Sequence, residues 1–324
     1  MEQIEAVDYA VVTATQINEK NGTTFLEANT VSVSLNEIKM DHLIPVFKNN
    51  QPVISQNDFI QSMIDVASNV YCNETINSPI VRVSHPIKGR IPDAKDKPAA
   101  DLMEHEKTIF YEKMAFSVQI PTISDTIDGN KLILTFGGVK SYASDNIYSR
   151  NGGDESFSIY VGFQNTVCLN SKIWSDGLVE NFKVRSIGEL KMCMEQLLRN
   201  YNSSYHLYHM KQLANYSITE KEFAGVIGRC RMYQHLQHAA KSGLPSLLFG
   251  DNQVNAVCKD YFRDKSFCRD ENGNINLWRL YNLFTGTNKS SYIDTFLERS
   301  VNAFDFVENI KHAVEGKSTN WFLN

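Results

Sequence analysis

The chain contains 324 residues, of which 42% are hydrophobic and 21% are charged, and its formal net charge is −5. This composition is typical of a soluble globular protein that buries one large α+β core or two subdomains. The sequence has no run of about 18 apolar residues, which excludes a transmembrane helix. Its first residues lack the cationic and apolar segments of a standard secretion signal, so we expect a cytoplasmic protein.

Six cysteines are scattered along the chain without a CxxC pair. In a chain of this length they predict reduced, mostly buried thiols and argue against a structural zinc site built from cysteines. The charge is unevenly divided, with 13 Lys and Arg against 21 Asp and Glu in residues 1–169, and 19 against 16 in residues 170–324. The basic second half permits an anionic partner without requiring one.

The N-terminal part begins with a polar segment. Residues 1–30 lack clear periodicity, which predicts a flexible tail. Alternation over Thr30–Ser34 predicts a short strand. Ser55 then offers a helix cap, and apolar residues recur at helical spacing from Phe59 to Val70.

From Pro79 onward the hydrophobic period changes to two, which indicates strands. The predicted strands are Ile80–His85, Thr108–Ile120, Lys131–Tyr142 and Phe157–Cys168. The sequence Asp128-Gly129-Asn130 predicts a hairpin turn between the second and third of them. The segment Lys88–Asp101 is a polar loop or extended arm, and loops of that length are more often functional than mere connectors.

After Ser186 the pattern becomes helical. Helices are predicted from Ile187 to near Asn200–Ser203 and over about 204–215, 219–238 and 252–263. The stretch Asn274–Val314 predicts a helical hairpin, because two amphipathic helices flank a short polar loop. Asn274 or Asn276 caps the first helix, Gly286 ends it, and Ser290 or Ser291 caps the second.

Strands followed by helices favour an α+β fold over alternating βαβ units. We therefore expect an antiparallel meander of about four strands packed with a mostly helical second half. The corresponding division is a tail over 1–30, a β-rich subdomain over 31–170 and a helical subdomain over 171–324.

No motif names a reaction. The pairs His206-x-x-His209 and His235-x-x-His238 lack a third ligand or an HExxH pattern, so surface or capping roles are favoured over a metal site. Asp270–Asn274 departs from a calcium loop, since glycine stands at the fourth position rather than the sixth. We assign no catalytic residue, cofactor or metal from the sequence.

Arginines beside aromatic residues in the second half are typical of single-stranded nucleic-acid surfaces, where cations contact phosphates and rings stack on bases. They are equally typical of a helical domain with a buried aromatic core. The predicted nucleic-acid contacts are Lys88, Arg90, Arg229, Arg231, Arg263, Arg279, Asn282 and Lys289.

Several long blocks between Pro79 and Asn324, in the same order, resemble a bacterial family of unknown function found near mobile elements. The blocks include IDGNKLILTFGGVKSY, VGFQNTVCLN and FCRDENGNINLWRLYNLFTGTNKSSYIDTFLERSVNAFDF. More distantly, Val167–Asn170 and Leu280–Thr285 are similar to the phage/plasmid-like protein family, although Ser171 stands where that family has glycine. Neither resemblance supplies catalytic residues. Both imply a phage, plasmid or conjugative element as the setting.

The first functional expectation is a non-enzymatic accessory protein of a mobile element that binds single-stranded DNA. The first alternative is a module that binds a host nuclease or defence protein through its acidic first half. The second is an enzyme whose polar groups converge only in three dimensions, marked by a strongly perturbed ionisable group. The sequence does not determine the oligomeric state.

Overall fold

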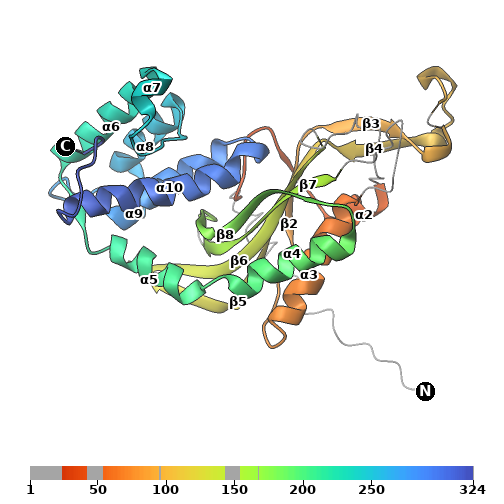
Figure 1. The fold of residues 1–324 in the computed structure, drawn as a ribbon, viewed down its shortest axis with the longest axis horizontal. Helices are drawn as coiled ribbons and strands as arrows, with labels where there is room; N and C mark the ends of the chain where they lie inside the picture. Colours follow the sequence, from red (N-terminus) through yellow and green to blue (C-terminus); the bar gives the residue numbers. More distant parts are fainter. Residues whose placement is uncertain (1–23, 42–53, 95, 143–153, 167, 324) are drawn as a thin grey trace.

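The structure is a computed structural model that describes residues 24–41, 54–94, 96–142, 154–166 and 168–323. Its centre is a six-stranded antiparallel sheet with the strand order β1-β2-β5-β6-β7-β8. Helices cover the sheet and form most of the second half of the chain (Figure 1). The α+β class predicted from the sequence is confirmed.

Strands β2, β5, β6 and β7, which contain residues of the four predicted strands, are antiparallel neighbours in this order, and β8 continues the meander at the edge of the sheet. The strands are β1 (Val31–Val33), β2 (Ile80–Val83), β5 (Lys113–Ile127), β6 (Asn130–Ser141), β7 (Glu155–Asn165) and β8 (Ser171–Val184). A two-residue turn joins β5 to β6, with Asp128 at φ 48° and Gly129 at φ 76°. Positive φ at both central residues is what a tight hairpin requires, which explains the Asp-Gly sequence.

Strand β8 was not predicted, because the expected helical part began at residue 171. It is an edge strand whose pairing with β7 shifts register twice, after Phe157 and after Tyr160. Each shift interrupts the alternation of buried and exposed residues, so the period-two signal disappears from the sequence.

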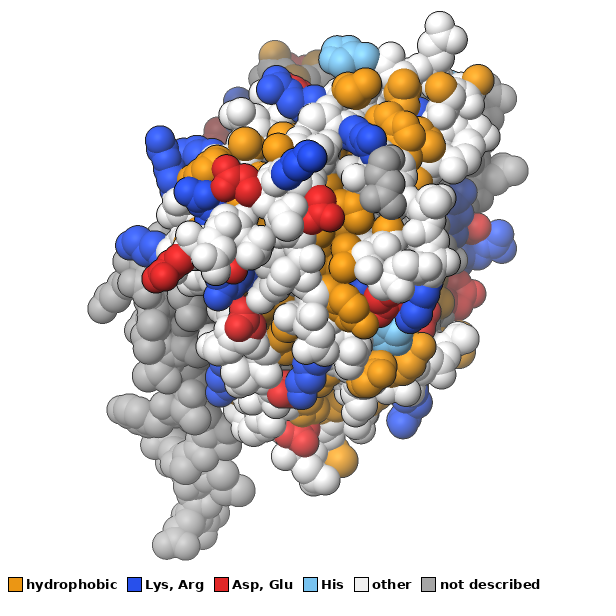
Figure 2. Space-filling model, turned by 90° about the vertical axis from the view of Figure 1, so that its left-hand side faces the viewer, with side chains coloured by type: hydrophobic (Ala, Val, Ile, Leu, Met, Phe, Trp, Pro, Cys, Tyr) orange, Lys and Arg blue, Asp and Glu red, His pale blue; other side chains and the backbone are white. Residues whose placement is uncertain are grey.

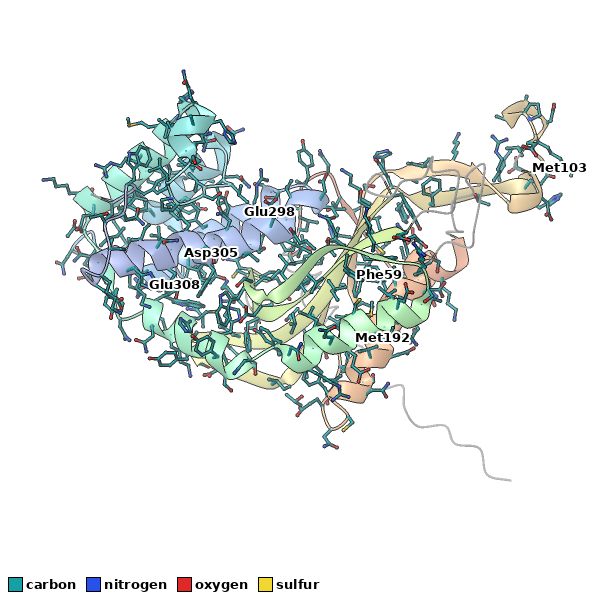
Figure 3. All side chains as sticks on the ribbon, viewed as in Figure 1. Phe59, Met103, Met192, Glu298, Asp305 and Glu308 are labelled. Carbon is teal, nitrogen blue, oxygen red and sulfur yellow. The ribbon has the colours of Figure 1, made fainter. Side chains whose placement is uncertain are left out.

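Each face of the sheet is covered by different helices. On one face lie α3 (Gln56–Val70) and α4 (Ile187–Asn200), with Phe59 of α3 packed 5.1 Å from the Phe116 ring and 4.8 Å from the Phe157 ring (Figure 3). The other face packs against Phe25, Leu26 and the start of α10. Ser55 caps α3 as predicted, accepting a bond from the Asp58 amide at 2.9 Å.

The second half is largely helical. Its helices are α5 (Ser203–Leu213), α6 (Glu220–His235), α7 (His238–Lys241), α8 (Asp251–Arg263), α9 (Leu277–Thr287) and α10 (Ile293–Val314). One continuous cluster of buried hydrophobic residues extends from the sheet into these helices. None of the described helices is long and apolar enough to cross a membrane.

The predicted helical hairpin is formed by α9 and α10. Asn276 caps α9 by accepting a bond from the Arg279 amide at 2.8 Å. The predicted cap of α10 is wrong, because its N-cap is Tyr292 and makes no side-chain cap bond. Ser290 lies instead in the short η5 helix (Asn288–Ser290), whose Asn288 is buried and donates to the Phe296 carbonyl at 2.9 Å.

The segment predicted as a loop or arm projects from the body (Figure 1). Strands β3 (Pro86–Arg90) and β4 (Lys107–Tyr111) pair as a two-stranded ribbon. Its tip contains η1 (Pro92–Ala94), η2 (Ala99–Asp101) and η3 (Glu104–Glu106), and Met103 is exposed there (Figure 3). The remaining short elements are α2 (Leu35–Asp41), β9 (Ser217–Ile218) and β10 (Ile275–Asn276).

Gly138 is where α3 approaches the sheet most closely. A Cβ atom at this position would lie 2.3 Å from Phe59 Cζ and 2.9 Å from the Ser158 carbonyl oxygen. We expect Gly138→Ala to lower the free energy of unfolding by roughly 1–3 kcal/mol through overpacking. Urea denaturation measures this effect.

The control is Gly228→Ala on α6, where no atom lies within 4 Å of the added Cβ. Because alanine is the better helix former, this variant is expected to be stabilised by up to about 1 kcal/mol. Equal effects of the two substitutions would contradict the close packing of α3 on β6.

Candidate functional site: a buried polar cluster between β8 and α9

The connection between β7 and β8 packs directly against α9. Leu169 adopts a positive φ of 52°, and the next residue, Asn170, is buried. The Asn170 amide donates to the main-chain carbonyl of Asn282 at 3.2 Å. The two segments pack closely, since a Cβ at Gly286 of α9 would lie 3.4 Å from Asn170 Nδ2. Residues more than 100 positions apart thereby become neighbours.

Lys172, at the start of β8, is fully buried in this contact. Its amine donates to the Asn170 carbonyl and to Thr285 Oγ1, both at 3.3 Å. It also lies 5.7 Å from the centre of the Trp278 ring and 5.6 Å from that of Tyr281. We call Asn170, Lys172, Trp278, Tyr281, Asn282 and Thr285 the Lys172 cluster.

The amine of Lys172 has no carboxylate within ion-pair distance in the part of the chain that the structure describes. Burial lowers its pKa to about 7; the neighbouring Cys168 opposes this shift and the charge of Lys289 adds to it. The other fully buried lysine of the sheet, Lys140, differs because it pairs with Glu155 at 3.1 Å. At neutral pH a large fraction of Lys172 is therefore the uncharged amine.

Four side-chain atoms of the cluster are buried and have no hydrogen-bond partner among the described residues. They are Asn170 Oδ1, Asn282 Oδ1, Trp278 Nε1 and the Tyr281 hydroxyl. The Asn282 amide nitrogen donates to the Trp278 carbonyl at 2.8 Å, which fixes the direction of its unpaired oxygen. Burial, with the charge of Asp305, holds the pKa of Tyr281 well above its usual value, so its hydroxyl stays protonated.

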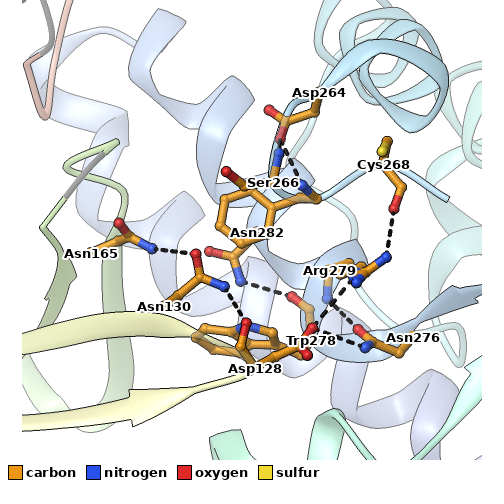
Figure 4. Close-up of polar contacts among 11 residues, drawn as sticks. Asp128, Asn130, Asn165, Asp264, Ser266, Cys268, Asn276, Trp278, Arg279 and Asn282 are labelled. Atoms are coloured by element: carbon orange, nitrogen blue, oxygen red, sulfur yellow. Dashed lines mark hydrogen bonds and ion pairs between the residues drawn. The ribbon is translucent and has the colours of Figure 1, made fainter. Parts of the chain in front are cut away.

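A half-exposed rim of polar residues lies beside the cluster, where the β5–β6 turn meets α9 (Figure 4). Asp128 accepts from Arg279 Nε at 3.3 Å and from Asn276 Nδ2 at 3.2 Å. Asn165 donates to Asn130 Oδ1 at 3.4 Å on the strand side of this rim. The rim is thus built from amides and one ion pair, and Trp278 and Asn282 lie next to it.

The ring of Phe304 contacts both His206 of α5 and Tyr281, with ring centres 5.8 and 5.6 Å away, respectively. His206 is fully buried, and its Nδ1 is 2.5 Å from the Tyr201 hydroxyl. Burial, aided by His209, lowers the pKa of His206 to about 3. The surface or capping role predicted for this histidine is therefore wrong. In the described residues no group of three or more His, Cys, Asp or Glu is arranged to hold a metal.

Three of the predicted nucleic-acid contacts lie together along α9 and η5. Arg279 belongs to the rim and Asn282 to the cluster, whereas the Lys289 amine donates to the Cys168 carbonyl. Burial lowers the pKa of Lys289, with Cys168 opposing the shift. These three side chains are used inside the protein.

The other five predicted residues are distributed over the arm and the outer helices. Arg229 donates to the Trp321 carbonyl at 2.6 Å, and Arg231 pairs with Asp251 at 2.7 Å. Arg263 is exposed at the end of α8. Lys88 and Arg90 lie on β3 of the arm.

Charges of both signs are interspersed on the face shown in Figure 2, where Lys and Arg do not form one basic patch. On α10, Glu298, Asp305 and Glu308 lie along the helix (Figure 3). Burial, with the charge of Glu308, raises the pKa of Asp305. This part of the surface does not favour a polyanion.

Lys172, Asn170 and Trp278 were not predicted as site residues. Asn170 and Tyr281 do belong to the two segments similar to the phage/plasmid-like family. Lys172 stands between Ser171 and Ile173 in a strand that was not predicted, so no sequence pattern marked it as buried.

A model for one protein family matches residues 6–323. Its description reads "Domain of unknown function, B. Theta Gene description (DUF3871)". The chain belongs to this family. No curated protein and no solved structure matches this chain.

The buried amine predicts a pH dependence of stability. In the unfolded chain lysine titrates near pKa 10.4, whereas folded Lys172 titrates at about 7. Between these values the unfolded chain binds more protons, so stability rises with pH. We expect a gain of roughly 2 kcal/mol from about pH 7 to about pH 9, which Lys172→Met removes. Urea denaturation at each pH measures this gain.

Lys191→Met is the control, because Lys191 is a half-exposed lysine paired with Asp65 on the surface. It should retain the rise in stability. If the free energy of unfolding depends on pH equally in wild type and in Lys172→Met, the amine is not held neutral in the folded protein.

Proposed function

We propose that the protein binds a small molecule with a carboxylate or carbonyl oxygen at the Lys172 cluster. The observation that carries this proposal is that four buried side-chain atoms without a hydrogen-bond partner belong to residues of the Lys172 cluster, whose buried amine has no carboxylate partner in the described residues. Buried polar groups are nearly always hydrogen-bonded, so a group of exceptions at one place calls for a specific cause. A ligand that pairs with them is such a cause.

The chemistry of the cluster defines the ligand class. Trp278 Nε1 and the Lys172 amine are donors, which suit an anionic or carbonyl oxygen. The two asparagine oxygens are acceptors, which suit a hydroxyl or amide N–H on the same molecule. The rings of Trp278 and Tyr281 supply apolar walls beside the amine. A small hydroxy, keto or amino acid has this combination of groups.

Ligand binding also offsets a cost in stability. Each buried polar atom without a partner destabilises the folded state by roughly 1–3 kcal/mol. A ligand that pairs with several of them recovers this free energy only in the bound state, which favours binding. Residues that lower stability in this way are characteristic of functional sites.

Tyr281→Phe tests the proposal, because it removes an unpaired hydroxyl and keeps the ring. We expect the variant to be about 1 kcal/mol more stable than wild type and to bind pyruvate and lactate about tenfold more weakly. Calorimetric titration and thermal unfolding measure the two effects.

Tyr261→Phe is the matched control. Tyr261 is equally buried, but its hydroxyl donates to the Gly273 carbonyl at 2.5 Å. This variant should lose stability and bind the two acids unchanged. Absence of saturable binding of pyruvate and lactate to wild type would overturn the proposal and leave ordered water as the partner of the cluster.

A second proposal, nucleic-acid binding by an accessory protein of a mobile element, is supported by the arm. The register of β3 and β4 pairs Lys88 with Ile109 and Arg90 with Lys107, which places three cations on one side of the ribbon. Ile109 and the two lysines are exposed. A projecting two-stranded ribbon with cations on one side has the dimensions of the DNA major groove.

Lys88→Glu tests this second proposal, with Lys191→Glu on α4 as the control. Fluorescence anisotropy with single-stranded and duplex DNA should show weaker binding for Lys88→Glu and a shallower dependence on salt, because a phosphate contact is lost. Unchanged binding, or no binding by wild type at low salt, would exclude the arm as a nucleic-acid contact. A protein partner would then be the alternative.

A further inference from the structure

We propose that Lys172 forms a covalent imine with the carbonyl carbon of an aldehyde or ketone bound in the cluster. This inference rests on the proposed ligand site and adds the chemical step that the site performs. It assigns to Lys172 the role of nucleophile and to Tyr281 that of proton donor.

The surroundings of the Lys172 amine are suited to a nucleophile. Both of its hydrogen-bond partners, the Asn170 carbonyl and Thr285 Oγ1, are uncharged. Its other neighbours include two aromatic rings and, in the described residues, no carboxylate that would hold it as an ammonium ion. Desolvation in such surroundings is how lysines become nucleophiles towards carbonyl compounds.

Lys140 is a buried lysine that has a carboxylate partner, and it can be compared with Lys172. It is equally buried in the sheet, but Glu155 lies 3.1 Å from its amine and the Phe157 ring centre lies 4.0 Å away. An ion pair favours the charged form, which has no lone pair for attack. Of these two buried lysines, Lys140 has a carboxylate partner, whereas Lys172 has none among the described residues.

The reaction balances without a further reagent. The lone pair of Lys172 Nζ forms a bond to the carbonyl carbon, the carbonyl π bond breaks, and the oxygen takes a proton to give a carbinolamine. The hydroxyl then leaves with a second proton as water, which leaves the C=N bond. Nζ loses its two protons over the two stages, and they balance the two that the oxygen takes. The Tyr281 hydroxyl stays protonated at neutral pH, and the rings of Tyr281 and Trp278 lie 5.6 and 5.7 Å from the amine.

The test is reductive trapping of wild-type protein with pyruvate and sodium borohydride, followed by peptide mass spectrometry. Borohydride adds hydride to the imine and makes the adduct permanent. We expect the adduct at Lys172, with little at Lys140, and a yield that rises to half its maximum near pH 7. Exposed lysines, which titrate near pKa 10.4, would show no such midpoint.

Lys172→Met is expected to lose the trapped adduct and retain its fold, which circular dichroism checks. Lactate is the matched ligand, because it lacks the ketone and cannot form an imine. Calorimetric binding of lactate and pyruvate without an adduct at Lys172 would overturn the imine and leave the proposed function standing. Absence of both binding and adduct would overturn both. If Lys172→Met fails to fold, the ratio of adduct at Lys172 to adduct at Lys140 in the wild-type protein decides whether the imine forms specifically at Lys172.

Discussion

Burial of the Lys172 amine between β8 and α9 is the constraint on which this part of the molecule depends. An amine without a carboxylate partner is buried at a cost, and that cost appears here as a pKa lowered to about 7. The contact is held by the packing of Trp278, Tyr281 and Phe284 of α9, all fully buried. The hydrophobic core of the helical half thus fixes the environment of one polar group on the sheet.

The side-chain amides around Lys172 are each held by a hydrogen bond, but they are only partly hydrogen-bonded. The amides of Asn170 and Asn282 each donate one bond to a main-chain carbonyl, whereas their oxygens have no partner in the described chain. Elsewhere, buried amides are paired: Asn288 donates two bonds, to Phe296 and Ser300, and Gln253 donates to Ser291. Four of the unpaired buried atoms in the described residues thus belong to this one cluster, whereas the others, such as Ser117 Oγ and His206 Nε2, lie on other elements.

Much of the fold was predictable from local sequence. The Asp128-Gly129 hairpin, the Ser55 cap of α3 and the Asn276 cap of α9 each follow from residues within one turn of each other. Strand β8 was missed because its register shifts interrupt the alternation. The cap of α10 was assigned to serines that bond instead within the buried loop, where Ser291 donates to Asn288 at 2.6 Å.

By itself, the sequence determined the α+β class and most of the strands and helices, and it selected the polar residues Arg279, Asn282 and Lys289 along α9 and η5. It predicted them as nucleic-acid contacts because composition does not show which side chains bond to other parts of the protein. Only the tertiary structure decided that Asn170 and Lys172 meet Asn282 and Thr285, which lie 112 and 113 residues further along the chain. Contacts of that range depend on how the sheet and the helices pack, and no spacing within either segment encodes them.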